Sequence, residues 1–247
     1  MDNTENKYSA RLIVVTSVFI TCLVISNIIA VKVIRVAGLN LPAAIIIFPI
    51  SYIFGDVLTE VYGYRTARKV IWLGFICNLF AVLAMWLGGL LPVSSDWYIG
   101  GYAPADAQHA YDAILGYTPR LLVASFTGYL MGEFANSFVL AKMKIFTKGR
   151  WLWTRTIGST FVGQLLDSGM FILIAFYGNP YINLGTMVVT HWLVKTAYEA
   201  LATPFTYVIV GYLKRKEGID TYDYQTNFNP LLIFPFSLFN RRKVSEQ

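Results

Sequence analysis

The sequence predicts an all-α membrane protein whose six transmembrane helices form one bundle. Two observations predict it, the composition and six long apolar runs. Of the 247 residues, 56% are hydrophobic and only 14% are charged, whereas soluble domains carry about 25% charged residues. So few charges cannot cover a wetted surface, which argues against a soluble enzyme. The same composition excludes a disordered chain.

Six stretches are long enough to cross about 30 Å of hydrocarbon, which takes about 20 helical residues. We expect the spans at 11–33, 41–62, 70–91, 119–141, 156–178 and 186–213. Gly or Pro residues lie near several of their ends, as is typical of helix boundaries. The first apolar run is too long for a cleaved signal sequence, so we expect a retained helix. The transmembrane domain then covers 1–216, and a cytoplasmic tail covers 217–247.

The basic residues predict the direction of the spans. Sixteen of the 20 Lys and Arg residues lie before or at the start of the first span, between spans two and three, between spans four and five, or after span six. Cytoplasmic loops of membrane proteins carry such an excess of Lys and Arg. Both termini are therefore expected in the cytoplasm. The net charge of +6 is explained by topology in the lipid bilayer, and no nucleic-acid partner is expected.

Two segments outside the spans have distinct compositions. The external loop 92–118 contains three Asp residues and several aromatic residues, which fits either a lid over the external mouth or an aromatic belt at the membrane interface. The tail contains a second apolar stretch, 228–239, interrupted by Pro230 and Pro235. It is too short to span, so we expect it on the inner membrane surface.

Ionisable side chains within the spans are the strongest functional signal. Each costs roughly 2.5–3.5 kcal/mol at the centre of an inserted helix, so each is expected to face the bundle interior, a water-filled cavity or a ligand. We expect a substrate-binding cluster near the midplane, with Asp56 and Glu60 closer to the inner face. Its ten candidate residues are Asn27, Asp56, Glu60, Asn78, Glu133, Asn136, Gln164, Asp167, Lys195 and Glu199.

Helical spacing leaves alternatives to direct substrate binding. Lys195 and Glu199 are i,i+4 neighbours, so they either contact substrate or form an ion pair that makes one helix insertable. For Asn78, Asn136 and Gln164, the alternative is hydrogen bonding between helices.

Asp56 and Glu60 are like charges on one helix face. Either one of them is protonated, or a cation from the following loop, Arg65 or Arg68, offsets them. The segment from Gly128 to Gly132 has the GxxxG pattern, which permits close helix approach. It indicates either an intramolecular contact, which we favour, or a homodimer face.

The sequence lacks the common signatures of catalysis and metal binding. It contains no GxxxxGK[ST], HExxH or GxSxG motif. Two histidines are too few for a zinc-site signature. Cys22 and Cys77 lie in apolar runs and are interpreted as small buried hydrophobic residues. We therefore expect a protein that is not an enzyme, with no catalytic residue, no metal and no cofactor.

Taken together, the polar residues resemble those of the queuosine-precursor transporter family, also called VUT. The resemblance extends over nearly the whole chain. It is carried by Ser26-Asn27, Ala30, Lys32, Phe48-Pro49, Tyr52, Asp56, Glu60, Tyr62-Gly63, Gly132-Glu133-Phe134, Asn136-Ser137, Lys142-Met143-Lys144, Gly163-Gln164, Asp167-Ser168, Lys195, Glu199, Thr203-Pro204 and Glu217-Gly218-Ile219-Asp220.

The resemblance implies a bacterial inner-membrane importer of 7-deazaguanine precursors of queuosine, namely preQ0, preQ1 or queuine, that works alone by alternating access. It also implies a bundle similar to the substrate-binding subunits of vitamin importers. The alternative function is such a vitamin-like binding subunit, which needs a separate ATPase module. A carboxylate of Glu133, Asp167 or Glu199 can accept hydrogen bonds from N1 and the 2-amino group of a deazaguanine.

Overall fold

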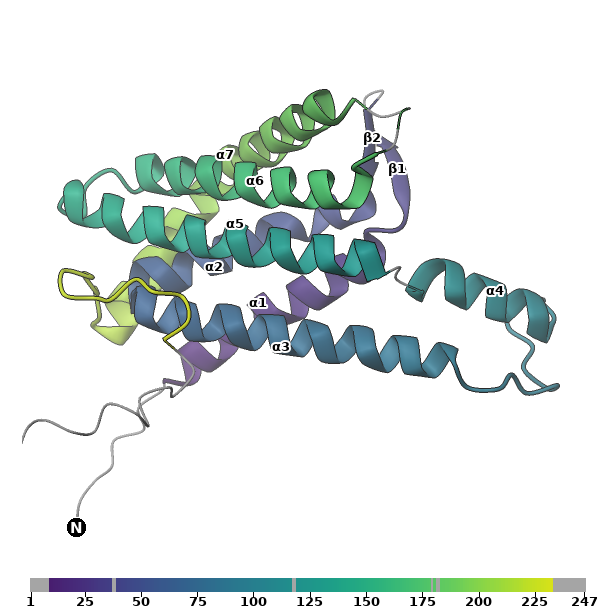
Figure 1. The fold of residues 1–247 in the computed structure, drawn as a ribbon. Coiled ribbons are helices and arrows are strands. Elements are labelled where there is room, and N and C mark those ends of the chain that lie inside the picture. The colour runs from purple at the N-terminus through teal and green to yellow at the C-terminus, as the bar shows by residue number, and fades with distance from the viewer. Residues whose placement is uncertain (1–8, 37–38, 117–118, 179, 181–182, 233–247) are drawn as a thin grey trace, which may run out of the picture.

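A computed structural model describes residues 9–36, 39–116, 119–178, 180 and 183–232. In this part of the chain six helices pack side by side and a further helix, α4, lies beyond one end of the bundle (Figure 1). The elements are α1 Ala10–Ile29, β1 Val33–Val36, β2 Leu39–Pro42, the 3-10 helix η1 Ala43–Ile46, α2 Phe48–Tyr62, α3 Tyr64–Gly89, α4 Pro104–Leu115, α5 Pro119–Phe146, α6 Leu152–Phe176 and α7 Leu184–Glu217.

The N-terminus of α1 and the C-terminus of α7 meet at one end of the bundle. The Ser9 hydroxyl accepts the Leu12 N–H and so caps α1. The same hydroxyl donates to Glu217 Oε1 at the end of α7, at 2.9 Å. Helices α2 and α3 also meet at this end, where Gly63 has φ 82° and ψ 165°, a conformation that is essentially restricted to glycine. We call this the basic end, because most of the Lys and Arg residues are near it.

Within the described residues, three helices are long and apolar enough to cross a membrane, as judged by length and composition: α1, α3 and α6. Helix α2 has only 15 residues, which extend about 22 Å. Helices α5 and α7 are longer, at 28 and 34 residues, but polar side chains interrupt their apolar sequences. A mostly helical membrane protein is thus supported, and the six crossings stay a prediction.

The structure differs from the predicted spans between α1 and α2. We expected helix up to residue 33 and again from 41, but β1 and β2 form an antiparallel hairpin, with Val33 opposite Pro42 and Val36 opposite Leu39. Valine and isoleucine favour strands, and the ladder pairs backbone groups that a helix would otherwise pair. The predicted bounds of the first two spans were wrong at this point, and α2 begins at Phe48.

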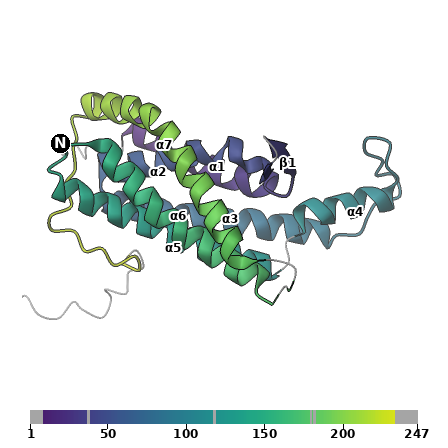
Figure 2. The same ribbon diagram turned by 90° about the horizontal axis from the view of Figure 1, so that it is seen from above.

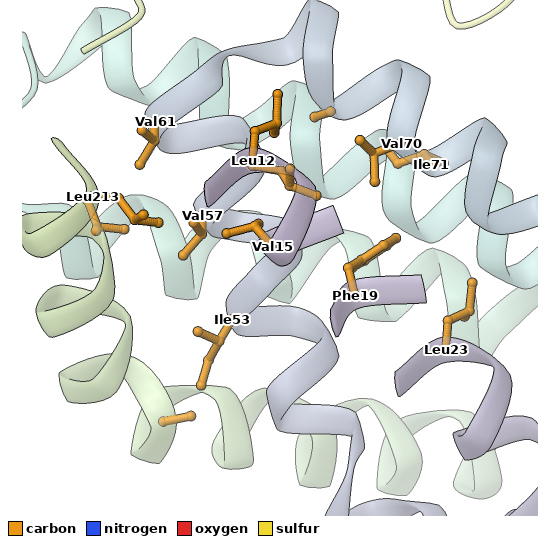
Figure 3. Close-up of a cluster of buried hydrophobic side chains, with 14 of the residues drawn as sticks. Leu12, Val15, Phe19, Leu23, Ile53, Val57, Val61, Val70, Ile71 and Leu213 are labelled. Carbon is orange, nitrogen blue, oxygen red and sulfur yellow. The ribbon is translucent and has the colours of Figure 1, made fainter. Parts of the chain in front are cut away.

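The hydrophobic core lies where α1, α2 and α3 meet, with Leu213 of α7 at its edge (Figure 3). Phe19 of α1 and Val57 of α2 are fully buried there. Because the core occupies this side of the bundle, the opposite face of α2 is left to contact α5, α6 and α7, which carry most of the polar residues.

Helices α5 and α6 pack closely along much of their length (Figure 1). The GxxxG glycines face α6: a Cβ added at Gly132 would lie 2.7 Å from Asp167 Cβ and 3.1 Å from the carbonyl oxygen of Gly163. A Cβ added at Gly163 would in turn lie 2.8 Å from Asn136 Cβ. The motif therefore forms an intramolecular contact, which was the favoured alternative.

The loop 92–118, which we predicted to be external, contains a helix that we did not predict. Helix α4 packs against the end of α3, where the Tyr111 hydroxyl donates to the Met85 carbonyl at 2.8 Å. A cavity of about 560 Å³ lies at this junction, and its lining includes Gly88 at the end of α3 and Gln108 and Tyr111 of α4. Both views show α4 projecting away from the bundle (Figures 1 and 2). This position does not support a lid over the predicted substrate site.

The described part of the tail packs on α3. Arg68 of α3 donates to the carbonyl oxygens of Asn227 and Asn229, at 2.9 and 2.8 Å. The Trp72 indole donates to the Pro230 carbonyl at 2.8 Å. The predicted interfacial stretch 228–239 thus begins docked on α3, and its part from 233 onward lies outside the described residues.

The close packing of α5 and α6 can be tested with alanine. We expect Gly132→Ala to destabilise the protein by about 1–3 kcal/mol, because the added methyl group overlaps the α6 backbone. The matched control is Gly169→Ala on α6, where an added Cβ meets nothing within 4 Å. Unfolding in detergent measures both variants. Equal stability of the two would contradict the packing described here.

Candidate functional site

Four helices each place a pair of polar residues, one turn apart, toward a shared interior region. Residues three or four apart share a helix face, so each pair points in one direction. We call these residues the central polar cluster: Tyr52 and Asp56 of α2, Glu133 and Asn136 of α5, Gln164 and Asp167 of α6, and Lys195 and Glu199 of α7. The cluster thus joins seven predicted site residues with Tyr52.

The half of the cluster farther from the basic end is held by direct contacts between helices. Lys195 Nζ lies 2.6 Å from Asp167 Oδ2, which is a salt bridge between α7 and α6. The Tyr52 hydroxyl donates to Gln164 Oε1 at 3.1 Å and also forms a hydrogen bond with Lys195. Tyr52 was missing from our predicted site, although it lies one turn before Asp56 on the same face.

The half nearer the basic end is rich in acids. Asn136 Nδ2 donates to Asp56 Oδ1 at 2.9 Å. Glu133 is 8% exposed and interacts electrostatically with Asp56, Asp167 and Lys195. Glu199 is 0% exposed, and its electrostatic neighbours are Asp56 and Glu133. Three carboxyl groups from three helices therefore lie within interaction range of one another.

Several buried acceptor atoms in this half lack a hydrogen-bond donor among the described residues. They are Asp56 Oδ2, Asn136 Oδ1 and both carboxyl oxygens of Glu199. A buried polar atom without a partner costs about 1–3 kcal/mol, and more when it is charged. Such a set of acceptors is suited to a ligand that brings donors, or to protons on the carboxyl groups.

Glu60 belongs to a different group, which we call the Glu60 ion cluster: Glu60, Lys144, Arg155, Lys214 and Asp220. Arg155 binds Glu60 through two hydrogen bonds of 2.7 and 2.8 Å. Lys214 Nζ lies 2.6 Å from Glu60 Oε1, and Lys144 Nζ lies 3.6 Å from the same oxygen. The prediction that Arg65 or Arg68 offsets this charge was wrong, because the cations that contact Glu60 come from α5, α6 and α7.

Asp220 completes the Glu60 ion cluster from the tail. Lys144 Nζ and Lys214 Nζ lie 2.6 and 2.8 Å from its Oδ1. Burial by itself would raise the pKa of Asp220, but the hydrogen bonds from the two lysines outweigh burial and hold the pKa below its usual value. The ion cluster thus ties α2, α5, α6, α7 and the tail together at the basic end.

Two predicted site residues form a contact of their own. Asn27 of α1 donates from Nδ2 to Asn78 Oδ1 of α3 at 2.9 Å. These helices meet on the side of the hydrophobic core, whereas the central polar cluster is built from the other four. Asn78 thus forms a hydrogen bond between helices, which was the alternative to substrate binding. Asn136 and Gln164 also form hydrogen bonds between helices.

The alternative ion pair within α7 is also corrected. Lys195 bonds to Asp167 of α6 and not to Glu199 one turn away. A lysine on a bundled helix can reach across to a neighbouring helix as easily as along its own, and Asp167 offers a contact of 2.6 Å. Glu199 is therefore left without the compensating charge that its spacing had indicated.

Comparison with known proteins identifies the family. Residues 42–209 match a family described as "Putative vitamin uptake transporter", which is more than half of the chain. The chain belongs to this transporter family. The predicted resemblance is confirmed, and so is the prediction of a transporter in place of an enzyme.

Two curated relatives of this family member carry related names. A "Probable queuosine precursor transporter" of Bacillus subtilis (strain 168) is 31% identical over 188 residues, which is 74% of this chain and 78% of the relative. The "Queuosine precursor transporter" of Escherichia coli (strain K12) is 25% identical over 146 residues, covering 59% of this chain and 58% of the relative. No solved structure gave a significant match.

Removal of Glu60 tests the ion cluster. Arg155 and Lys144 have side chains that are 2% exposed, so Glu60→Ala leaves buried cations without their carboxylate. We expect a loss of about 3–5 kcal/mol in unfolding free energy, measured in detergent. The control is Glu217→Ala, whose partner Arg11 is 44% exposed; its effect should be much smaller. Equal losses would contradict a special role for the Glu60 ion cluster.

Proposed function

We propose that this protein imports 7-deazaguanine precursors of queuosine and binds them at the central polar cluster. The observation that carries the proposal is the set of unpaired acceptors on Asp56, Asn136 and Glu199. The substrate class is supported by the names of the two relatives in this transporter family. Such a base is flat and presents several N–H groups, so it can supply the donors that these acceptors lack.

The hydrogen-bonding pattern of the base suggests roles for individual residues. N1–H and the 2-amino group lie side by side, and one carboxylate can accept both. Glu199 is our first candidate for this role, and Glu133 is the second. Asp56 Oδ2 and Asn136 Oδ1 remain as acceptors for a further N–H group. The O6 atom needs a donor, which Gln164 or Lys195 can provide.

The Glu60 ion cluster supports a carrier with alternating access. Glu60 lies four residues after Asp56 on α2, about 6 Å along the helix axis. The ion pairs join the four site helices at the basic end, so they close this end next to the proposed site. Substrate release there requires the helices to separate.

The distribution of charge supports an orientation in the membrane. The basic end carries the outer ends of α1 and α7, which meet through Ser9 and Glu217. Lys and Arg are typical of the cytoplasmic side. We therefore place the basic end in the cytoplasm of a bacterial cell and the protein in its inner membrane. Release at the Glu60 ion cluster is then release into the cytoplasm.

Substrate binding tests the proposed site. We expect Glu133→Gln and Glu199→Gln each to weaken binding of preQ1 roughly 10- to 100-fold, because a hydrogen bond to a charged group contributes about 1.5–3 kcal/mol. Titration of purified protein in detergent measures this affinity. Glu217→Gln on the same helix is the matched control and should bind like the unmodified chain.

The choice of ligands sharpens this test. Guanine and hypoxanthine, which differ by the 2-amino group, report whether that group is recognised, and preQ0, preQ1 and queuine rank the precursors. Unchanged affinity in both glutamate variants would remove the central polar cluster as the site. Absence of binding for the whole series would reject the substrate class.

Reconstitution in liposomes distinguishes a carrier from a binding subunit. We expect the purified chain alone to transport labelled preQ1 into liposomes without ATP, and Glu199→Gln to lose this uptake. Binding without uptake would instead support a vitamin-like binding subunit that needs a separate ATPase module.

A further inference from the structure

We propose that the empty central polar cluster holds protons on its carboxyl groups, with Glu199 as the principal carrier, and that substrate binding releases one of them to water. The release step rests on the proposed function, because it needs the substrate. The protonated state of the empty site does not, and it can be tested without any ligand.

Glu199 and Glu60 provide an internal comparison. Both are glutamates with 0% exposure in the same bundle. Glu60 is bound by Arg155 and Lys214, with Lys144 also in ion-pair range. Neither carboxyl oxygen of Glu199 has a hydrogen-bond partner among the described residues. The structure thus compensates one buried carboxylate with three cations and provides no such compensation for the other.

The charged and titratable groups around Glu199 do not favour its ionised form. The other titratable groups of the cluster are Tyr52 and Asp56 of α2, Glu133 of α5, Asp167 of α6 and Lys195 of α7, and His191 of α7 lies one turn before Lys195. Those that interact electrostatically with Glu199 are Asp56 and Glu133, and both are acids. The lysine forms its salt bridge with Asp167. Like charges that share a buried site cannot all be ionised at once.

The amide of Asn136 supports the same assignment independently of the acids. Its Nδ2 donates to Asp56 Oδ1, so its Oδ1 lies at the cluster as an acceptor. That oxygen has no partner in the described part of the chain, and the residue is 7% exposed. A carboxyl group that carries a proton is a donor, and a substrate N–H is another. Among the described residues these particular acceptors therefore lack donors, and protons on the neighbouring carboxyl groups supply them.

Substrate binding replaces the O–H donor of a protonated carboxyl group with the N–H donors of the base. A protonated carboxyl group accepts through one oxygen and presents an O–H through the other, which opposes a second N–H donor. The carboxylate accepts both N1–H and the 2-amino group. On binding, the O–H bond of the carboxyl group breaks, the proton passes to water or buffer, and the base keeps all its atoms. Affinity then rises as the pH rises.

Infrared difference spectroscopy tests the first part. Substrate-free protein at neutral pH should show the C=O stretching band of a protonated carboxyl group, shifted in D₂O. Glu199→Gln should lose the Glu199 contribution, and Glu217→Gln should retain it. Glutamine resembles protonated glutamic acid in size and charge, so we expect this variant to fold. A spectrum unchanged by Glu199→Gln would overturn the proposal, whether or not a ligand binds.

Calorimetry tests the second part. The probe is preQ0, because its nitrile side chain does not titrate near neutral pH. Titrations in two buffers of different ionisation enthalpy should report about one proton released per preQ0 bound, and the affinity should rise about tenfold per pH unit. Zero proton release with measurable binding would overturn the linkage. Complete absence of binding would count against the proposed substrate, and the infrared result would then decide the protonation.

Discussion

The placement of charge inside an apolar bundle is the constraint on which this structure depends. An ionised group removed from water must be paired, hydrogen-bonded or neutralised. At the basic end the bundle uses pairing: Arg155, Lys144 and Lys214 converge on Glu60 from three helices. Glu199 of α7, which is equally buried, has no such partner among the described residues. The contrast separates a closed structural contact from the cluster that we propose as the substrate site.

The close packing of α5 and α6 brings the polar residues of these helices together. Small residues permit helix axes to approach in membranes, and here Gly132 and Gly163 contact the opposite backbone. Asn136 lies against Gly163, and Asp167 lies against Gly132. The glycines therefore bring the polar pair of α5 next to the polar pair of α6. Larger side chains at these two positions would push the helices apart.

The region that matches the family contains the central polar cluster. The matched region, 42–209, contains all eight residues of the central polar cluster together with Glu60, Lys144 and Arg155. Lys214 and Asp220, which complete the ion cluster, lie beyond it, and so does the tail that packs on α3. The matched region thus includes the cluster-bearing parts of all four site helices, and the tail adds further contacts at the basic end.

The sequence alone determined that the protein is a helical membrane protein and that acids and amides lie within its apolar runs. It also determined which polar residues share a face, because the helical repeat makes residues three or four apart neighbours. Tyr52, one turn before Asp56 on the same face, was missed although its spacing carried this signal.

Only the tertiary structure decided which helices meet, and therefore which partner each polar group finds. Lys195 selects Asp167 of α6 over Glu199 of its own helix, and Glu60 binds cations more than 80 residues away in sequence. The hairpin between α1 and α2 and the position of α4 were likewise invisible to helix spacing. Contacts between helices depend on packing of whole surfaces, and no local repeat encodes them.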